Sequence, residues 1–194
     1  GLGPLGNTLV GFYGFAIFFL PILAGVFVDR YGFRKSLAAC FLIFSLGYFA
    51  VGLAGASWGP LAEGSSWRVP YVVGALLVTA IGGSLIKPCI VGTVARTTNE
   101  ETKGLGYSIY YTLVNLGGAL GPILALTVRE GWGIEYVLMM SAAVSALNLG
   151  GTLLFFREPP VMGGTPSGKT LGKVFADMMV VFRDFRFISF LLIF

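Results

Sequence analysis

One ionisable side chain interrupts the long apolar segments of this sequence, and its position predicts a functional site. Lys87 lies within the apolar run from 69 to 95, nine residues before Arg96. On a helix this is about 13.5 Å at ~1.5 Å per residue, near the middle of a ~30 Å bilayer core. An ammonium group there costs on the order of a few kcal/mol and is usually kept for function. Snorkelling to the interface is the alternative.

Pro88 follows Lys87 directly and changes the hydrogen bonding of the same segment. Proline has no N–H, so the carbonyl of Ser84 loses its helical partner, and Gly82 and Gly83 remove bulk one turn earlier. We predict a helix that bends here. A backbone ligand site and a packing kink both remain open.

Tyrosines recur at helical spacing in the next apolar segment. Tyr107, Tyr111 and Asn115 are four residues apart and so share one face, and Tyr110 lies beside it. Unsatisfied hydroxyls and amides are costly in hydrocarbon, so this face is predicted to point to a cavity or a neighbouring helix. For Asn115, substrate contact and interhelical hydrogen bonding are both open.

Small residues and a second polar face follow. Gly117-x-x-x-Gly121, followed by Pro122, is typical of close helix packing. In the last long segment four polar residues share a face, which we interpret mainly as interhelical hydrogen bonding, with substrate contact as the alternative. They are Ser141, Ser145, Asn148 and Thr152.

A short charged stretch follows an uncharged run from 6 to 28. Its pattern is G-x-x-x-D-R-x-G-x-R-K, formed by Gly25, Asp29, Arg30, Gly32, Arg34 and Lys35. Asp29 at the end of one helix and the bases beyond it are predicted to act as a conformational latch, with ion pairs that form and break. Anchoring of the membrane topology is the alternative.

Composition indicates an all-α transmembrane chain. Hydrophobic residues make up 56% of the 194 residues, charged residues only 11%, and the mean hydropathy is +0.84. About 20 apolar residues cross a bilayer as a helix, whereas a barrel would show shorter alternating segments. Five runs are long enough, and we predict a helix for each: 6–28, 36–57, 69–95, 104–128 and 136–156.

Charge and aromatic residues agree on the orientation of these helices. Ten of the 13 basic residues lie in alternate loops and the tail, and all three tryptophans lie in the other loops. By the positive-inside rule the basic loops face the cytoplasm, and the tryptophans mark the outer interface. The chain is therefore predicted to begin outside and end inside.

The C-terminal region differs from the helical part. Residues 157–186 contain Pro and Gly clusters and are predicted to be a cytoplasmic linker. Residues 187–194 start another apolar run that is too short to span, so we expect the beginning of a further helix.

Several other classes of function are disfavoured. The bases form no single stripe, so no nucleic-acid partner is expected. The sequence has no histidine, and no metal site, enzymatic chemistry or cofactor is expected. Cys40 and Cys89 lie in different apolar runs and are interpreted as small buried hydrophobes, with a disulfide as the alternative.

The charged pattern at 25–35 resembles the loop between the second and third helices of major facilitator superfamily transporters, although Phe33 stands where that family often has a base. The resemblance implies helices two to six of a bundle, the linker and the start of helix seven. It also implies alternating access against a second half of the same protein, with the bilayer, a small solute and protons as partners. The expected location is the plasma membrane, or inner membrane of a bacterium, as a multi-pass protein.

A narrower resemblance concerns the substrate. The segments from Gly82 to Pro88 and from Gly106 to Gly117 resemble the proton-coupled oligopeptide transporter family, although Thr112 and Ala119 depart from its pattern. This implies that Lys87 binds a peptide carboxylate and that Tyr110 or Tyr111 contacts the peptide.

Two alternatives to peptide uptake remain. The Gly117 to Pro122 motif also resembles drug/proton antiporters, although Leu124 and Ala125 replace that family's later glycines. A membrane sensor or scaffold without transport is the third hypothesis.

Overall fold

The computed structural model describes residues 27–57, Gly59 and residues 65–159, together with isolated positions at 11, 20, 21, 24, 25, 172, 180 and 189. Most of the predicted helix at 6–28, nearly all of the predicted linker and all of the segment 187–194 except Ser189 lie outside the described residues. The chain divides into two units, residues 1–160 and 161–194, and the first contains all the helices discussed below.

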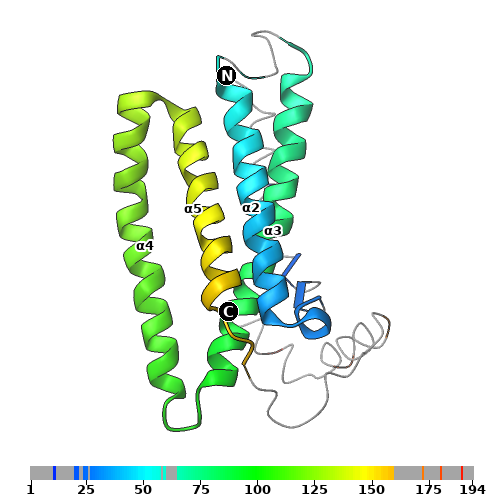
Figure 1. The fold of residues 1–194 in the computed structure, drawn as a ribbon, viewed down its shortest axis with the longest axis vertical. Helices are drawn as coiled ribbons and strands as arrows, with labels where there is room; N and C mark the ends of the chain where they lie inside the picture. Colours follow the sequence, from blue (N-terminus) through cyan, green and yellow to red (C-terminus); the bar gives the residue numbers. More distant parts are fainter. Residues whose placement is uncertain are drawn as a thin grey trace. The chain divides into compact units, whose positions relative to one another are not determined.

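Among the described residues, four helices of membrane-spanning length follow one another in the first unit (Figure 1). They are α2 (Phe33–Gly55), α3 (Arg68–Thr97), α4 (Lys103–Trp132) and α5 (Ile134–Phe155). Each contains an apolar window with few charges, which confirms the predicted all-α transmembrane class. The helices α3 and α4 extend a few residues beyond the predicted apolar runs, because polar residues at their ends still complete helical turns.

The helix α2 packs extensively against both α3 and α5. Its crossing with α3 depends on glycines. A Cβ atom on Gly47 would lie 2.5 Å from Thr79 Oγ1, and one on Gly82 would lie 3.0 Å from Ile43 Cγ2. The absence of side chains at these two points lets the helices approach closely, which favours dispersion contacts between them.

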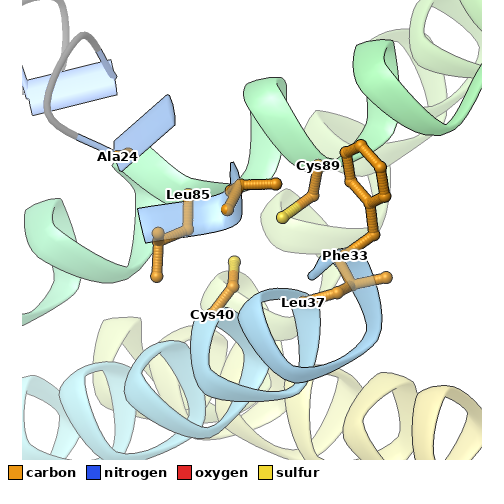
Figure 2. Packing of buried hydrophobic residues seen from close by; sticks show 7 residues of the cluster. Ala24, Phe33, Leu37, Cys40, Leu85 and Cys89 are labelled. Carbon is orange, nitrogen blue, oxygen red and sulfur yellow. The ribbon is translucent and has the colours of Figure 1, made fainter. Parts of the chain in front are cut away.

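A buried apolar cluster lies between α2, α3 and residues that precede α2, near the charged loop (Figure 2). It contains Ala24, Val28, Phe33, Leu37, Cys40, Leu85 and Cys89. The side chains of Cys40 and Cys89 point toward one another from α2 and α3, and both thiols are free. Both cysteines are buried, as predicted.

The hydroxyl groups on the polar face of α5 donate within their own helix, whereas the sequence predicts mainly interhelical hydrogen bonding for this face. The hydroxyl groups of Ser141, Ser145 and Thr152 each donate to the carbonyl four residues earlier in α5, over 2.8 to 2.9 Å. A hydroxyl surrounded by apolar atoms can satisfy itself on its own helix in this way. Thr79 does the same on α3, with Ala75 as acceptor at 2.9 Å.

The glycine contact at Gly47 gives a prediction about stability. Gly47→Ala places a methyl group against Thr79, whose backbone N and Cα would both lie 3.2 Å away. Overpacking of this kind costs about 1–3 kcal/mol, so we expect a lower Tm for the full-length protein in detergent.

Gly74 is the matched control, because a Cβ atom there meets nothing within 4 Å. In a helix, Ala is more stable than Gly by roughly 0.5–1 kcal/mol, so Gly74→Ala should leave Tm unchanged or raise it. Equal effects of the two substitutions would show that the crossing is not tight at Gly47.

Candidate functional site

The charged loop turns sharply at Gly32, immediately before α2. Gly32 has a φ of +85°, a conformation that L side chains rarely adopt. Its N–H donates to the Val28 carbonyl over 2.8 Å, which ends the preceding helical residues. The glycine of the sequence pattern is therefore required by the backbone of the turn. The earlier glycine, Gly25, is half-buried and has no atom near its Cβ position.

The charged side chains of this loop face outward. Asp29, Arg30 and Lys35 are exposed, and the guanidinium of Arg30 lies 5.5 Å from the ring centroid of its neighbour Tyr31. The side chain of Arg34 donates to the carbonyl oxygen of Leu153 on α5. In the part of the chain that the structure describes, the latch residues make no ion pair in this conformation, and the latch itself stays a prediction.

Sequence reasoning missed an important residue of this region, Glu158. One carboxylate oxygen accepts from the Phe33 backbone N–H over 2.6 Å, and the other accepts from the Arg34 N–H over 2.8 Å. Glu158 falls in the segment predicted to be linker, more than 120 residues from its partners. No local spacing pattern could have connected them; the only signal was an acid next to the last long apolar run.

Phe33 departs from the loop pattern and has a distinct structural role. Its side chain is 4% exposed and packs on α3, where a Cβ atom on Gly92 would lie 2.5 Å from the ring. The guanidinium carbon of Arg96 lies 4.6 Å from the ring centroid, a cation–π distance. A base at position 33 could not make these contacts.

The second group of predicted site residues lies within the membrane-spanning helices. Lys87 is on α3 with an exposed side chain. The helix continues through Pro88 from Arg68 to Thr97, so the predicted bend does not interrupt it. The hydroxyl of Ser84, one turn earlier, donates to the Ile81 carbonyl over 2.7 Å.

The helix α4 presents its polar residues without burying them. The rings of Tyr110 and Tyr111 contact each other with centroids 4.9 Å apart, and Asn115 is exposed. None of the 30 residues of α4 is buried. The start of α4 contacts the end of α3, where Gly106 lies beside Val94 of α3 and beside Thr98, the residue that follows α3.

The predicted packing glycines of α4 are open in this structure. Among the described residues, no atom lies within 4 Å of a Cβ atom placed on Gly117 or Gly121. Pro122 also leaves the helix intact, since α4 runs on to Trp132. Their predicted role in close packing needs a partner other than α2, α3 and α5.

A cavity of about 390 Å³ lies elsewhere, between α2 and α5. It contains two of the polar residues of α5 but none of Lys87, Tyr110, Tyr111 and Asn115. Its lining is Phe41, Asn148, Gly151, Thr152, Phe155 and Phe156. The described residues include no group of three or more metal-ligating side chains.

Comparison with known families identifies this arrangement of helices. The model of the Major Facilitator Superfamily matches residues 3–194. The chain belongs to the major facilitator superfamily. It is accordingly an integral multi-pass membrane chain of a family of transporters, which are not enzymes.

Individual relatives of this superfamily chain are distant. A Na(+), Li(+), K(+)/H(+) antiporter of Planococcus maritimus is 23% identical over 137 residues, which is 71% of this chain and 30% of the relative. The uncharacterized transporter YclF of Bacillus subtilis (strain 168) is 25% identical over 146 residues, 74% of this chain and 27% of the relative. The chain therefore spans less than a third of these relatives.

A solved structure shows the same fold. The inward open conformation of the xylose transporter XylE from E. coli superimposes with a TM-score of 0.62 at 16% identity. The match covers 92% of this chain and 47% of XylE, so the matched part of this chain corresponds to about half of that transporter.

The Phe33–Arg96 contact can be tested with a double-mutant cycle. Phe33→Leu keeps an apolar side chain but removes the ring face, and Arg96→Gln removes the cation. We expect a coupling free energy of about 0.5–1 kcal/mol from thermal unfolding of the full-length protein.

Phe44→Leu combined with Arg96→Gln is the matched control. Phe44 is also on α2 and packs on Gly83 of α3, away from Arg96, so this pair should be additive. Additivity of the Phe33 pair as well would show that the cation does not interact with the ring.

Proposed function

We propose that the full-length protein is a secondary transporter that works by alternating access and takes up small peptides together with protons. The observation that carries this proposal is Lys87, an exposed ionisable side chain inside the 30-residue membrane helix α3. Intramembrane lysines are expensive and face cavities or pathways rather than lipid. Sites of secondary transporters lie near the bilayer midplane, the depth expected for Lys87.

The exposed face of α4 supplies the second part of the argument. Tyr110, Tyr111 and Asn115 offer hydroxyl and amide groups in a membrane helix that buries none of its residues within the described bundle. In hydrocarbon such groups need hydrogen-bond partners. A solute between α4 and the rest of the transporter would satisfy them.

The chemistry of these groups fits a zwitterionic ligand. The Lys87 ammonium pairs with a carboxylate in a water-poor site, where charge-assisted hydrogen bonds are strong. Tyrosine hydroxyls and the Asn115 amide both donate and accept, as a peptide bond and an amino terminus require. A small peptide therefore uses all three residue types.

Proton coupling is supported by family resemblance and by one relative. The motifs around Lys87 and Asn115 resemble those of proton-coupled peptide transporters, and one relative is named for cation/proton antiport. We propose the plasma membrane as the location, since a proton gradient across that membrane would drive uptake.

Proton-driven antiport of amphipathic drugs is the second candidate. It is favoured by the segment from Gly117 to Pro122, which leaves open space on α4, and by the antiporter among the relatives. Symport would accumulate solute inside the cell and antiport would expel it, so the direction of flux separates the two proposals.

Lys87→Ala tests the peptide proposal directly. Full-length protein in proteoliposomes with an inward proton gradient should accumulate a labelled dipeptide, and Lys87→Ala should reduce uptake at least about tenfold, the effect of losing roughly 1.4 kcal/mol of binding or transition-state interaction. A dipeptide with an amidated C-terminus should compete poorly with wild type, because it lacks the carboxylate.

Lys103→Ala is the matched control for charge. Lys103 is exposed at the start of α4. We therefore expect Lys103→Ala to take up dipeptide at close to the wild-type rate. Undiminished uptake by Lys87→Ala would overturn the role of Lys87. Gradient-driven expulsion of an amphipathic cation, without dipeptide uptake, would instead favour the antiporter.

A further inference from the structure

The first turn of α2 lacks the groups that normally stabilise the start of a helix. Gly32 occupies the N-cap position and provides no side-chain acceptor, and no acid is present in the first turn. The first N–H groups of a helix have no partner within it. The positive end of the helix dipole also disfavours Arg34 and Lys35, the two bases of this turn.

Glu158 supplies what this turn lacks. Its two carboxylate oxygens accept from the N–H groups of Phe33 and Arg34, at 2.6 and 2.8 Å. An anion at a helix N-terminus is favourable for both the hydrogen bonds and the dipole. The carboxylate reaches the helix because Gly32 has no side chain: a Cβ atom there would lie 2.8 Å from Glu158 Oε1.

Further contacts connect the same turn to two other helices. Arg34 donates from its side chain to the Leu153 carbonyl, near the end of α5. The Phe33 ring packs on Gly92 and under Arg96 of α3. The backbone N–H of Phe33 donates to Glu158, which lies just beyond the end of α5. Phe33 therefore contacts both α3 and the segment that follows α5.

We propose that Glu158 is a positioning residue of the transport cycle, which fastens the loop from Asp29 to Lys35 to the end of α5 so that both move together. The effect on transport rests on the proposed function, whereas the contact between Glu158 and the first turn of α2 is seen in the structure itself. Loss of the carboxylate frees the first turn of α2 and uncouples the loop from α5, whereas the α2 packing at Gly47 and at Gly52, beside Met139 of α5, remains.

Hydrogen exchange of the full-length protein in lipid nanodiscs tests the contact without any substrate. In Glu158→Ala, the amides of Phe33 and Arg34 should exchange at least about tenfold faster than in wild type, because each loses a hydrogen bond to a charged acceptor. Glu100→Ala, at an exposed turn between α3 and α4, is the control and should not change these amides. Unchanged exchange in Glu158→Ala would overturn the proposal.

Turnover per binding site tests the positioning role. Dipeptide binding sites are counted in the same proteoliposomes used for gradient-driven uptake, so that turnover is expressed per competent molecule. Glu158→Ala should keep the dipeptide Kd and lower turnover per site at least about fivefold, which corresponds to roughly 1 kcal/mol of activation free energy. Glu158→Gln keeps the size of the side chain and one carbonyl acceptor but loses the charge. Its turnover per site should lie between those of wild type and Glu158→Ala.

A merely structural role gives a different result. If Glu158 only supported folding, the variant would have fewer sites with unchanged turnover per site, and this outcome would overturn the positioning role. If wild type neither binds nor transports dipeptide, the peptide proposal fails, and the hydrogen-exchange result alone decides whether Glu158 fastens the loop.

Discussion

Close packing of α2 on α3, made possible by glycines, is the constraint on which the described bundle depends. Inside a bilayer the lipid chains are as apolar as the side chains, so helices associate mainly through dispersion contacts and interhelical hydrogen bonds. The crossing uses Gly47 on α2 and Gly82 and Gly92 on α3, each facing a side chain of the other helix. The last of these contacts buries Phe33 at the start of α2. The position of the charged loop therefore follows from the same contacts that hold the helices together.

The sequence predicted the helices well because the bilayer imposes a simple physical rule. A spanning segment must satisfy its own backbone and be apolar over about 20 residues, and α2 to α5 are all visible as such runs. Local patterns also identified Gly32, whose positive φ a turn requires. The role of Glu158 was not predictable in this way, since it caps a helix more than 120 residues earlier. Phe33 was recognised only as a departure from a pattern, because its contacts with Gly92 and Arg96 depend on how α2 crosses α3.

The two candidate regions differ in how complete they are within this chain. At the start of α2, the Glu158 carboxylate accepts from two backbone N–H groups, and the buried Phe33 ring lies beside the Arg96 guanidinium. Lys87, Tyr111 and Asn115 are exposed on the described bundle, whereas Tyr110 is half-buried. The structural match covers 47% of XylE. Under the proposed function, the rest of the full-length transporter would complete the site around Lys87 and the α4 residues. Glu158 would then act on transport by changing how the helices move, and not by touching the solute.

Proton-coupled peptide symport, proposed above for the full-length protein, is tested most directly by the pH inside proteoliposomes. Full-length protein is reconstituted with a pH-sensitive dye in the lumen, and a dipeptide is added outside without any imposed gradient. A symporter carries protons inward with the peptide, so we predict that the lumen becomes more acidic at a rate that saturates with dipeptide concentration. No pH change with dipeptide, together with a lumen that becomes more alkaline when an amphipathic cation is added, would contradict the claim and identify an antiporter.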